Sequence, residues 1–221
     1  SSDVCSSDLK LQGKKTSRVK TQMSFTEPST ASPTFITLSV DDQQELLSLA
    51  RESIRVRLLL DRDLLIDETA FSPALQQQAT SFVTLRKKGQ LRGCIGSTQA
   101  TEPLVTSVVH HAIASAIDDP RFPPVTLKEE SDLHIGISVL STPTPLSFTN
   151  EKELLELLSS KKDGLTIEVG ANKATFLPDV WNSMKDETEF LAQLKLKADL
   201  AIDFWSDHFK AWRYQTYCFS E

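Results

Sequence analysis

Residues 133–140 have the sequence Leu-His-Ile-Gly-Ile-Ser-Val-Leu, in which apolar side chains alternate with polar or small ones. In an extended strand this alternation places the apolar side chains on one face and leaves the other face polar. A single buried face is typical of antiparallel sheets, because strands of a parallel sheet are covered on both faces and are apolar throughout. The stretch therefore predicts a half-buried strand and favours antiparallel pairing.

Further strands are predicted on both sides of this stretch. Residues 81–85 and 90–97 flank a turn at Lys87-Lys88-Gly89, which is typical of a hairpin. Later in the chain, short alternating or apolar runs predict strands at residues 165–169, 173–177 and 214–219.

Helical spacing of apolar residues predicts helices between these strands. Ser39, followed by two acidic residues, is a plausible cap for the first helix, and Pro120 ends the second. The predicted helices cover residues 40–60, 103–118, 150–158, 186–198 and 202–211. Because helices and strands interleave and several strands alternate in polarity, we predict an α+β fold with a mostly antiparallel sheet rather than a doubly wound parallel sheet.

The composition limits the classes of function. The chain has 221 residues and a formal net charge of −6. Residues 1–22 carry five basic and two acidic side chains, so the rest of the chain carries a net charge of −9. Nucleic-acid binding depends on Lys and Arg side chains that neutralise phosphates, so a general nucleic-acid surface is not expected. The apolar stretch 103–117 is too short to cross a bilayer, so we expect no membrane segment.

The beginning of the chain differs from the remainder. Residues 1–34 are rich in Ser, Thr and Lys and have no helical or strand period. The first Met is Met23, and we expect the native start at or near it. We therefore expect residues 1–34 to be a disordered or non-native tail and residues 35–221 to form the folded domain.

The three cysteines, Cys5, Cys94 and Cys218, are widely separated and odd in number. No pair has the spacing of a zinc motif, and no disulfide framework is indicated. We expect a reducing compartment and predict no metal or other cofactor.

Residues 91–97, Leu-Arg-Gly-Cys-Ile-Gly-Ser, are the first segment that could carry chemistry. Glycine inside a strand marks a bulge or a close approach of backbone or ligand, so Gly93 and Gly96 are candidate substrate-binding positions. Arg92 could bind a carboxylate or phosphate, and Cys94 could be a nucleophile whose pKa is lowered by nearby positive charge. The alternative is a bulged strand with an inert buried cysteine and a structural ion pair.

Residues 118–124, Asp-Asp-Pro-Arg-Phe-Pro-Pro, are the second such segment. Its three prolines stiffen the backbone, so Asp119 and Arg121 are presented from a rigid loop. They could form an anion clamp beside a carboxylate that acts as acid or base; the alternative is a loop held by an Asp–Arg pair. A shared anion site requires Arg92 and Arg121 to lie together, and separate ion pairs for the two would contradict it.

Two adjacent histidines lie in the predicted helix 103–118. The helical period places His110 away from the apolar face and His111 at its border. We therefore expect His110 to face solvent and His111 to be partly buried. His111 is the better candidate for a base, with a structurally satisfied histidine as the alternative.

The first segment also carries a family resemblance. Residues 91–96, Leu-Arg-Gly-Cys-Ile-Gly, resemble the signature of the AMMECR domain family, and within it AmmeMemoRadiSam system protein A. Asp179 and Asp199 depart from the family pattern, which usually has Gln and Gly there, and the second departure puts a tight helix end in doubt. The resemblance extends in order through residues 82–85, 119–124, 137–141, 175–178, 180–181, 190–191 and 197–198.

The resemblance implies two interlocked subdomains: a larger one with a mostly antiparallel sheet flanked by helices, and a smaller inserted α+β one, with a cleft between them. It also implies a cytoplasmic protein of the AmmeMemoRadiSam enzyme system, with a Memo-like protein and a radical-SAM protein as partners. Its activity would be the modification of an RNA or a small molecule.

Two functional hypotheses follow. In the first, the protein belongs to an enzyme system acting on an anionic small molecule or RNA-derived substrate. Cys94 is then nucleophile or covalent carrier, Arg92 and Arg121 hold substrate charge, and His111 or Asp119 is the base. In the second, the protein is a non-catalytic adaptor whose two signature segments form a docking surface. The sequence does not indicate the oligomeric state.

Overall fold

The computed structural model describes residues 34–158 and 162–221, so the predicted tail lies outside the described residues except for Thr34. Two compact units make up the described chain. Unit 1 comprises residues 34–142 and 215–221, and unit 2 comprises residues 143–214. The second unit is thus inserted, in sequence, between the two parts of the first.

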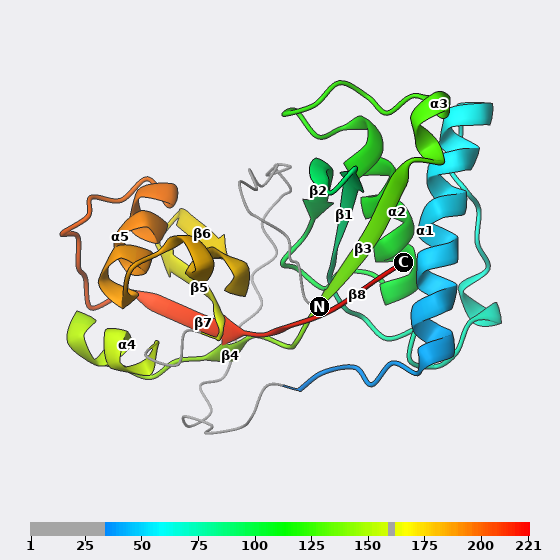
Figure 1. Cartoon of the computed structure of the whole chain (residues 1–221). Helices are drawn as coiled ribbons and strands as arrows, with labels where there is room; N and C mark the ends of the chain where they lie inside the picture. The colour runs from blue at the N-terminus through cyan, green and yellow to red at the C-terminus, as the bar shows by residue number, and fades with distance from the viewer. Residues whose placement is uncertain (1–33, 159–161) are drawn as a thin grey trace. The chain divides into compact units, whose positions relative to one another are not determined.

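Unit 1 is built on a four-stranded antiparallel sheet with the strand order β2-β1-β3-β8 (Figure 1). The long alternating stretch forms β3 with the predicted bounds, which confirms the antiparallel α+β prediction. The elements of this unit are α1 (Val40–Leu60), η1 (Glu68–Ala70), β1 (Ser81–Lys87), β2 (Gln90–Gly96), α2 (Leu104–Ile117), α3 (Leu127–Glu130), β3 (Leu133–Leu140) and β8 (Thr216–Ser220).

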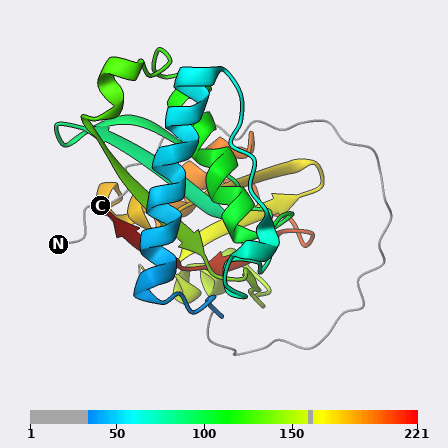
Figure 2. The ribbon, with the colours of Figure 1, turned by 90° about the vertical axis from the view of Figure 1, so that its right-hand side faces the viewer.

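Helices α1 and α2 pack together on one face of this sheet (Figure 2). Because residues two apart in a strand share a face, β1 and β3 direct mainly apolar side chains toward these helices. The exception at the start of β1 is Ser81, whose hydroxyl is 2.9 Å from that of Ser107 on α2. These strands and helices enclose the core of the unit, which includes Leu46, Ala50, Ile54, Val83, Leu85, Val105, Val108, Ala112, Ile135, Ile137 and Val139. The opposite face of the sheet carries smaller and more polar residues, among them Thr84, Cys94, Gly136 and Ser138.

The β1–β2 hairpin closes through two residues with positive φ, Lys88 at 52° and Gly89 at 80°. Such a pair is the feature of the tight type I′ turn, whose twist matches that of the strands. The pairing register shifts between Leu85 and Arg86, because Leu85 pairs with Gly93 but Arg86 pairs with Leu91. Arg92 therefore lies in a β-bulge. A bulged strand was one of the two interpretations of residues 91–97.

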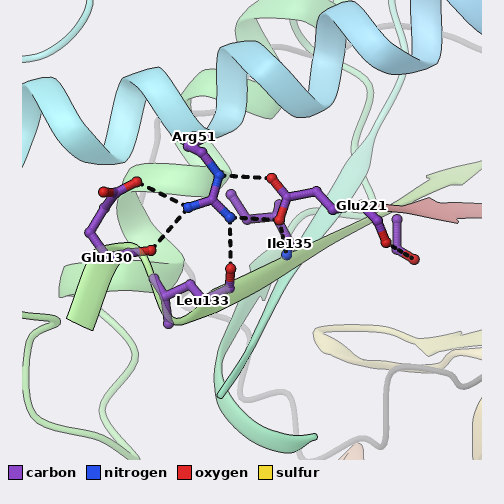
Figure 3. Close-up of polar contacts among 6 residues, drawn as sticks. Arg51, Glu130, Leu133, Ile135 and Glu221 are labelled. Atoms are coloured by element: carbon purple, nitrogen blue, oxygen red, sulfur yellow. Dashed lines mark hydrogen bonds and ion pairs between the residues drawn. The ribbon is translucent and has the colours of Figure 1, made fainter. Parts of the chain in front are cut away.

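Arg51 ties together four parts of unit 1 (Figure 3). Its guanidinium binds both carboxylate oxygens of Glu221 at 2.8 and 2.6 Å, and it also donates to the side chain and carbonyl of Glu130 and to the carbonyl of Leu133. The same Glu221 carboxylate accepts the Ile135 N–H at 3.0 Å. All five guanidinium N–H donors are thus used, and this network joins α1, α3, β3 and the residue after β8.

Unit 2 has its own four-stranded antiparallel sheet with the order β4-β7-β5-β6. Its core includes Trp181 stacked on Phe190, with ring centroids 3.7 Å apart. The elements are β4 (Thr144–Pro145), α4 (Glu151–Leu157), β5 (Gly164–Val169), β6 (Asn172–Phe176), η2 (Pro178–Ser183), α5 (Glu187–Lys197) and β7 (Lys210–Tyr214).

The predicted helix at residues 202–211 is wrong. Turns and irregular backbone occupy residues 201–209, and β7 follows. The buried ammonium of Lys195 accounts for part of this, because it donates to the carbonyl of Ile202 at 3.1 Å, an oxygen that a helix would use for its own ladder. Trp205 and Phe209 stack with centroids 4.9 Å apart, so the spacing that resembled a helix face reflects aromatic packing in a loop.

Helix α5 keeps a tight end in spite of Asp199. Asp199 adopts a left-handed conformation with φ of 57°, and the Leu200 N–H returns to the carbonyl of Lys195. The side chain of Asn172 donates to the carbonyl of Ala198 at 2.7 Å. The tight end that the Gly-to-Asp departure put in doubt is therefore present, because these hydrogen bonds hold Asp199 in a conformation that usually favours glycine.

Candidate functional site

The two signature segments meet at Cys94 on the outer edge of β2. The backbone N–H of Cys94 donates to the Asp119 carboxylate at 2.8 Å, and its carbonyl accepts from Arg121 Nη2 at 3.2 Å. Asp119 and Arg121 lie in the loop after α2, which brings them back to this strand. The structure thus brings together three of the predicted site residues, with the Asp–Arg pair bound to both polar backbone groups of the cysteine.

The Asp119 carboxylate is fully engaged. One oxygen accepts the Arg121 backbone N–H at 3.1 Å and Nε at 2.9 Å, and the other accepts Arg121 Nη2 and the Cys94 N–H, both at 2.8 Å. Burial by itself would raise the pKa of Asp119, but these hydrogen bonds outweigh it, and the pKa lies below its ordinary value. Four hydrogen bonds occupy the acceptor positions of the carboxylate, so its geometry suits a structural anion better than a base.

The Cys94 side chain is 1% exposed and lies on the sheet face opposite the helices. Its sulfur is 3.2 Å from the hydroxyl of Thr84, the residue that pairs with it on β1. The thiol is thus enclosed by the protein rather than presented to solvent. This environment fits the buried-cysteine alternative.

Gly93 and Gly96 are needed for packing. A Cβ on Gly93 would overlap the carbonyl oxygen of Ser115, where α2 presses against β2. A Cβ on Gly96 would overlap the ring of Phe82 and the backbone of β1. The Ser115 hydroxyl also accepts from the backbone N–H of Ile95 at 2.8 Å. The close approach that the glycines predicted is thus made by the protein's own backbone and side chains.

Arg92 lies in a different ion pair from Arg121. Its guanidinium binds the Glu129 carboxylate of α3, with Nη2 3.2 Å from one oxygen and Nε 3.4 Å from the other. Lys87 binds the same carboxylate at 2.9 Å. Hydrogen bonds from Arg92 and then Lys87 lower the pKa of Glu129 to about 2. The two arginines therefore have separate carboxylate partners, Glu129 and Asp119, and the prediction that they form one shared anion site is wrong.

His111 belongs to another cluster. Its Nδ1 is 3.1 Å from the hydroxyl of Ser81 and 3.2 Å from that of Ser107, and the two hydroxyls are 2.9 Å apart. Burial, helped by the nearby charge of His110, lowers the pKa of His111 to about 4. The imidazole is therefore neutral at physiological pH and is bonded to serines rather than to Cys94. His110 is 56% exposed in its side chain and pairs with a carboxylate, as expected for the outer histidine.

Within residues 34–158 and 162–221, no group of three or more His, Cys, Asp or Glu side chains could hold a metal ion. In the same part of the chain no helix has the length and apolar character needed to cross a membrane.

A family model for AMMECR1 matches residues 47–219. The chain belongs to the AMMECR1 family. A Methanothermobacter thermautotrophicus protein is 35% identical to this AMMECR1-family chain over 186 residues, which cover 83% of the chain and 96% of that protein. A Thermofilum pendens protein is 33% identical over 200 residues, with 83% and 92% coverage. The crystal structure of the uncharacterized protein PH0010 from Pyrococcus horikoshii has a TM-score of 0.71 and 34% identity, and covers 80% of this chain and 90% of its own. These comparisons confirm the family and the α+β fold.

Several residues that shape this AMMECR1-family site were not predicted from the sequence. Thr84 contacts the cysteine, Ser115 bridges α2 and β2, and Glu129 binds Arg92. Glu129 lies three residues after Thr126, and the two form a capping box, a pattern visible in the sequence. That pattern would have indicated a helix start, but not the pairing with a distant arginine.

Proposed function

We propose that this AMMECR1-family protein is a non-catalytic binding component of a cytoplasmic AmmeMemoRadiSam system, with a Memo-like protein and a radical-SAM protein as its partners. The observation that carries the proposal is the internal use of the signature side chains. The Asp119 and Arg121 side chains hold the backbone of Cys94, and the thiol itself is buried. A nucleophilic cysteine needs access to its substrate, and the buried position of Cys94 does not provide it.

A protein-binding role also needs apolar surface that a partner can cover. The end of α1 and the segment after it expose three leucines: Leu59 is 50% exposed, Leu60 57% and Leu65 84%. Large apolar side chains grouped on one surface segment are typical of sites that bind other proteins. We therefore place the docking surface at residues 59–65 rather than at the signature segments.

Binding of the purified Memo-like and radical-SAM proteins to the full chain tests this proposal, by size-exclusion chromatography and biolayer interferometry. Leu65→Ser should weaken the association, whereas Val40→Ser, which removes a 65% exposed apolar side chain at the other end of α1, should not. Cys94→Ser should bind as the wild type does. No association with either protein, or equal loss in both surface variants, would refute the docking role.

The competing function is enzymatic, with Cys94 as nucleophile for an anionic small molecule or RNA-derived substrate. Iodoacetamide kinetics on the folded chain across about pH 6 to 9 separates the two functions. The binding role predicts that Cys94 is alkylated far more slowly than the exposed Cys218. Fast alkylation of Cys94 with an apparent pKa below that of an ordinary thiol would favour the enzyme.

A further inference from the structure

Two cations of the β1–β2 hairpin, Lys87 and Arg92, are paired with the same carboxylate. Residues 86–92 contain four basic side chains and no acidic one, although the chain as a whole is acidic. Two of the four, Lys87 and Arg92, share the single carboxylate of Glu129. One carboxylate for two cations leaves a net positive charge between the hairpin and α3.

Arg92 also retains unused hydrogen-bonding capacity. Its side chain is 12% exposed, and its Nη1 atom is buried without a hydrogen-bond partner among the described residues. The other two guanidinium nitrogens are taken by Glu129. A buried, charged N–H group without an acceptor is costly, and such groups commonly bind an ion or water that the protein itself does not supply.

We infer that Arg92 and Lys87 form a binding site for a phosphate group, carried by a small phosphomonoester or present as free phosphate. A guanidinium and an ammonium are the side chains that phosphate oxygens prefer, and the several oxygens of one phosphate can bind both. The side chains of Lys87 and Glu129 are 30% and 22% exposed, so a ligand reaches Arg92 after a small movement of either. Arg121 takes no part, and the site does not depend on the proposed docking function.

Because Glu129 pairs with Arg92 and Lys87, removing its negative charge should strengthen phosphate binding. The carboxylate competes with a phosphate for the same two cations, and it also repels the phosphate. Glu129→Gln should therefore bind phosphate several-fold more tightly than the wild type does. Arg92→Gln and Lys87→Gln should each weaken binding about tenfold, the effect of losing one charge-assisted hydrogen bond.

Nitrogen-15 NMR titration of the full chain tests the site, with inorganic phosphate and glycerol 3-phosphate as separate probes and chloride keeping the ionic strength constant. We expect saturable shifts of the Arg92 Nε–H and of backbone amides in residues 86–92 and 126–129. Lys128→Gln removes one positive charge beside Glu129 on α3 and should change the affinity less than about twofold. Tighter binding of glycerol 3-phosphate identifies a phosphomonoester ligand, and tighter binding of inorganic phosphate identifies the free anion.

Shifts that increase without saturation would overturn the inference, as would equal losses in Lys87→Gln and Lys128→Gln. If Arg92→Gln fails to fold, the other two variants still test the site, because Lys87→Gln should weaken phosphate binding and Glu129→Gln should strengthen it. Partner binding in the docking assay is a separate measurement, so failure of the phosphate site leaves that proposal standing.

Discussion

Replacing His111 with Asn should remove a defined part of the protein's sensitivity to acid. In the folded chain the pKa of His111 is about 4, whereas an unfolded chain has the ordinary value near 6.5. Between these two pH values the unfolded state binds more protons, so the free energy of unfolding falls as the pH falls. Above about pH 6.5 His111 causes no loss in the free energy of unfolding, and by about pH 4 its share of that loss is nearly complete.

The size of the effect follows from the two pKa values. Each pH unit in this window contributes about 1.4 kcal/mol, so lowering the pH from 6.5 to 4 should cost the wild type about 3 kcal/mol through His111 alone. Asn places a neutral polar group near the position of Nδ1, within reach of the hydroxyls of Ser81 and Ser107. His111→Asn should therefore be less stable than the wild type at pH 7 but lose less stability on acidification.

Urea unfolding at a series of pH values measures this difference. The control is His110→Asn on the same helix, because His110 is exposed and its replacement leaves the burial of His111 unchanged. That variant should retain the acid sensitivity, with the proton NMR titration of His111 moved to slightly higher pH because one neighbouring charge is gone. Parallel stability curves for the wild type and His111→Asn between pH 4 and 6.5 would refute the reasoning.

Three further predictions concern stability at neutral pH, measured by urea unfolding. Arg51→Lys should lose about 2 kcal/mol, because an ammonium cannot reproduce the forked contacts of the guanidinium, whereas Arg55→Lys on the exposed side of α1 should change stability by less than about 0.5 kcal/mol. Asp199→Gly should stabilise the chain by about 0.5–1 kcal/mol by relieving a left-handed conformation, more than Asp199→Asn does; a loss of stability would contradict this. Gly93→Ala should lower the free energy of unfolding by about 3 kcal/mol or more. Its control is Gly136→Ala, which should be close to neutral because the new Cβ would lie 3.8 Å from its nearest neighbour. Similar losses of stability in both variants would count against the packing role of Gly93.

The sequence predicted best those elements whose pattern depends on one buried face. The strand at residues 133–140 has the predicted bounds, and the helices at 40–60 and 104–117 match the predicted ones within one residue at either end. The loop at 202–209 was mistaken for a helix because its aromatic spacing arises from stacking and from a buried lysine that takes a backbone carbonyl. Periodicity alone does not distinguish these cases.

The candidate site was predicted in part. The two signature segments do meet, and His110 and His111 have the predicted difference in exposure. The sequence could not show that Arg92 pairs with Glu129, because the partners are 37 residues apart and meet only once the hairpin and α3 are in place. Nor could it show that the space beside Gly93 is filled by the carbonyl of Ser115.

The contacts at Cys94 have a consequence for solubility. A strand at the rim of a sheet presents unpaired N–H and C=O groups that can recruit a strand from another molecule, which is a route to aggregation. On β2 the Asp119 carboxylate and the Arg121 guanidinium take the places that a neighbouring strand's carbonyl and amide would occupy. The pair brings two full charges to the edge of β2, where an incoming chain would have to displace them. The Asp119–Arg121 pair thus opposes association between copies of the protein through this edge of the sheet.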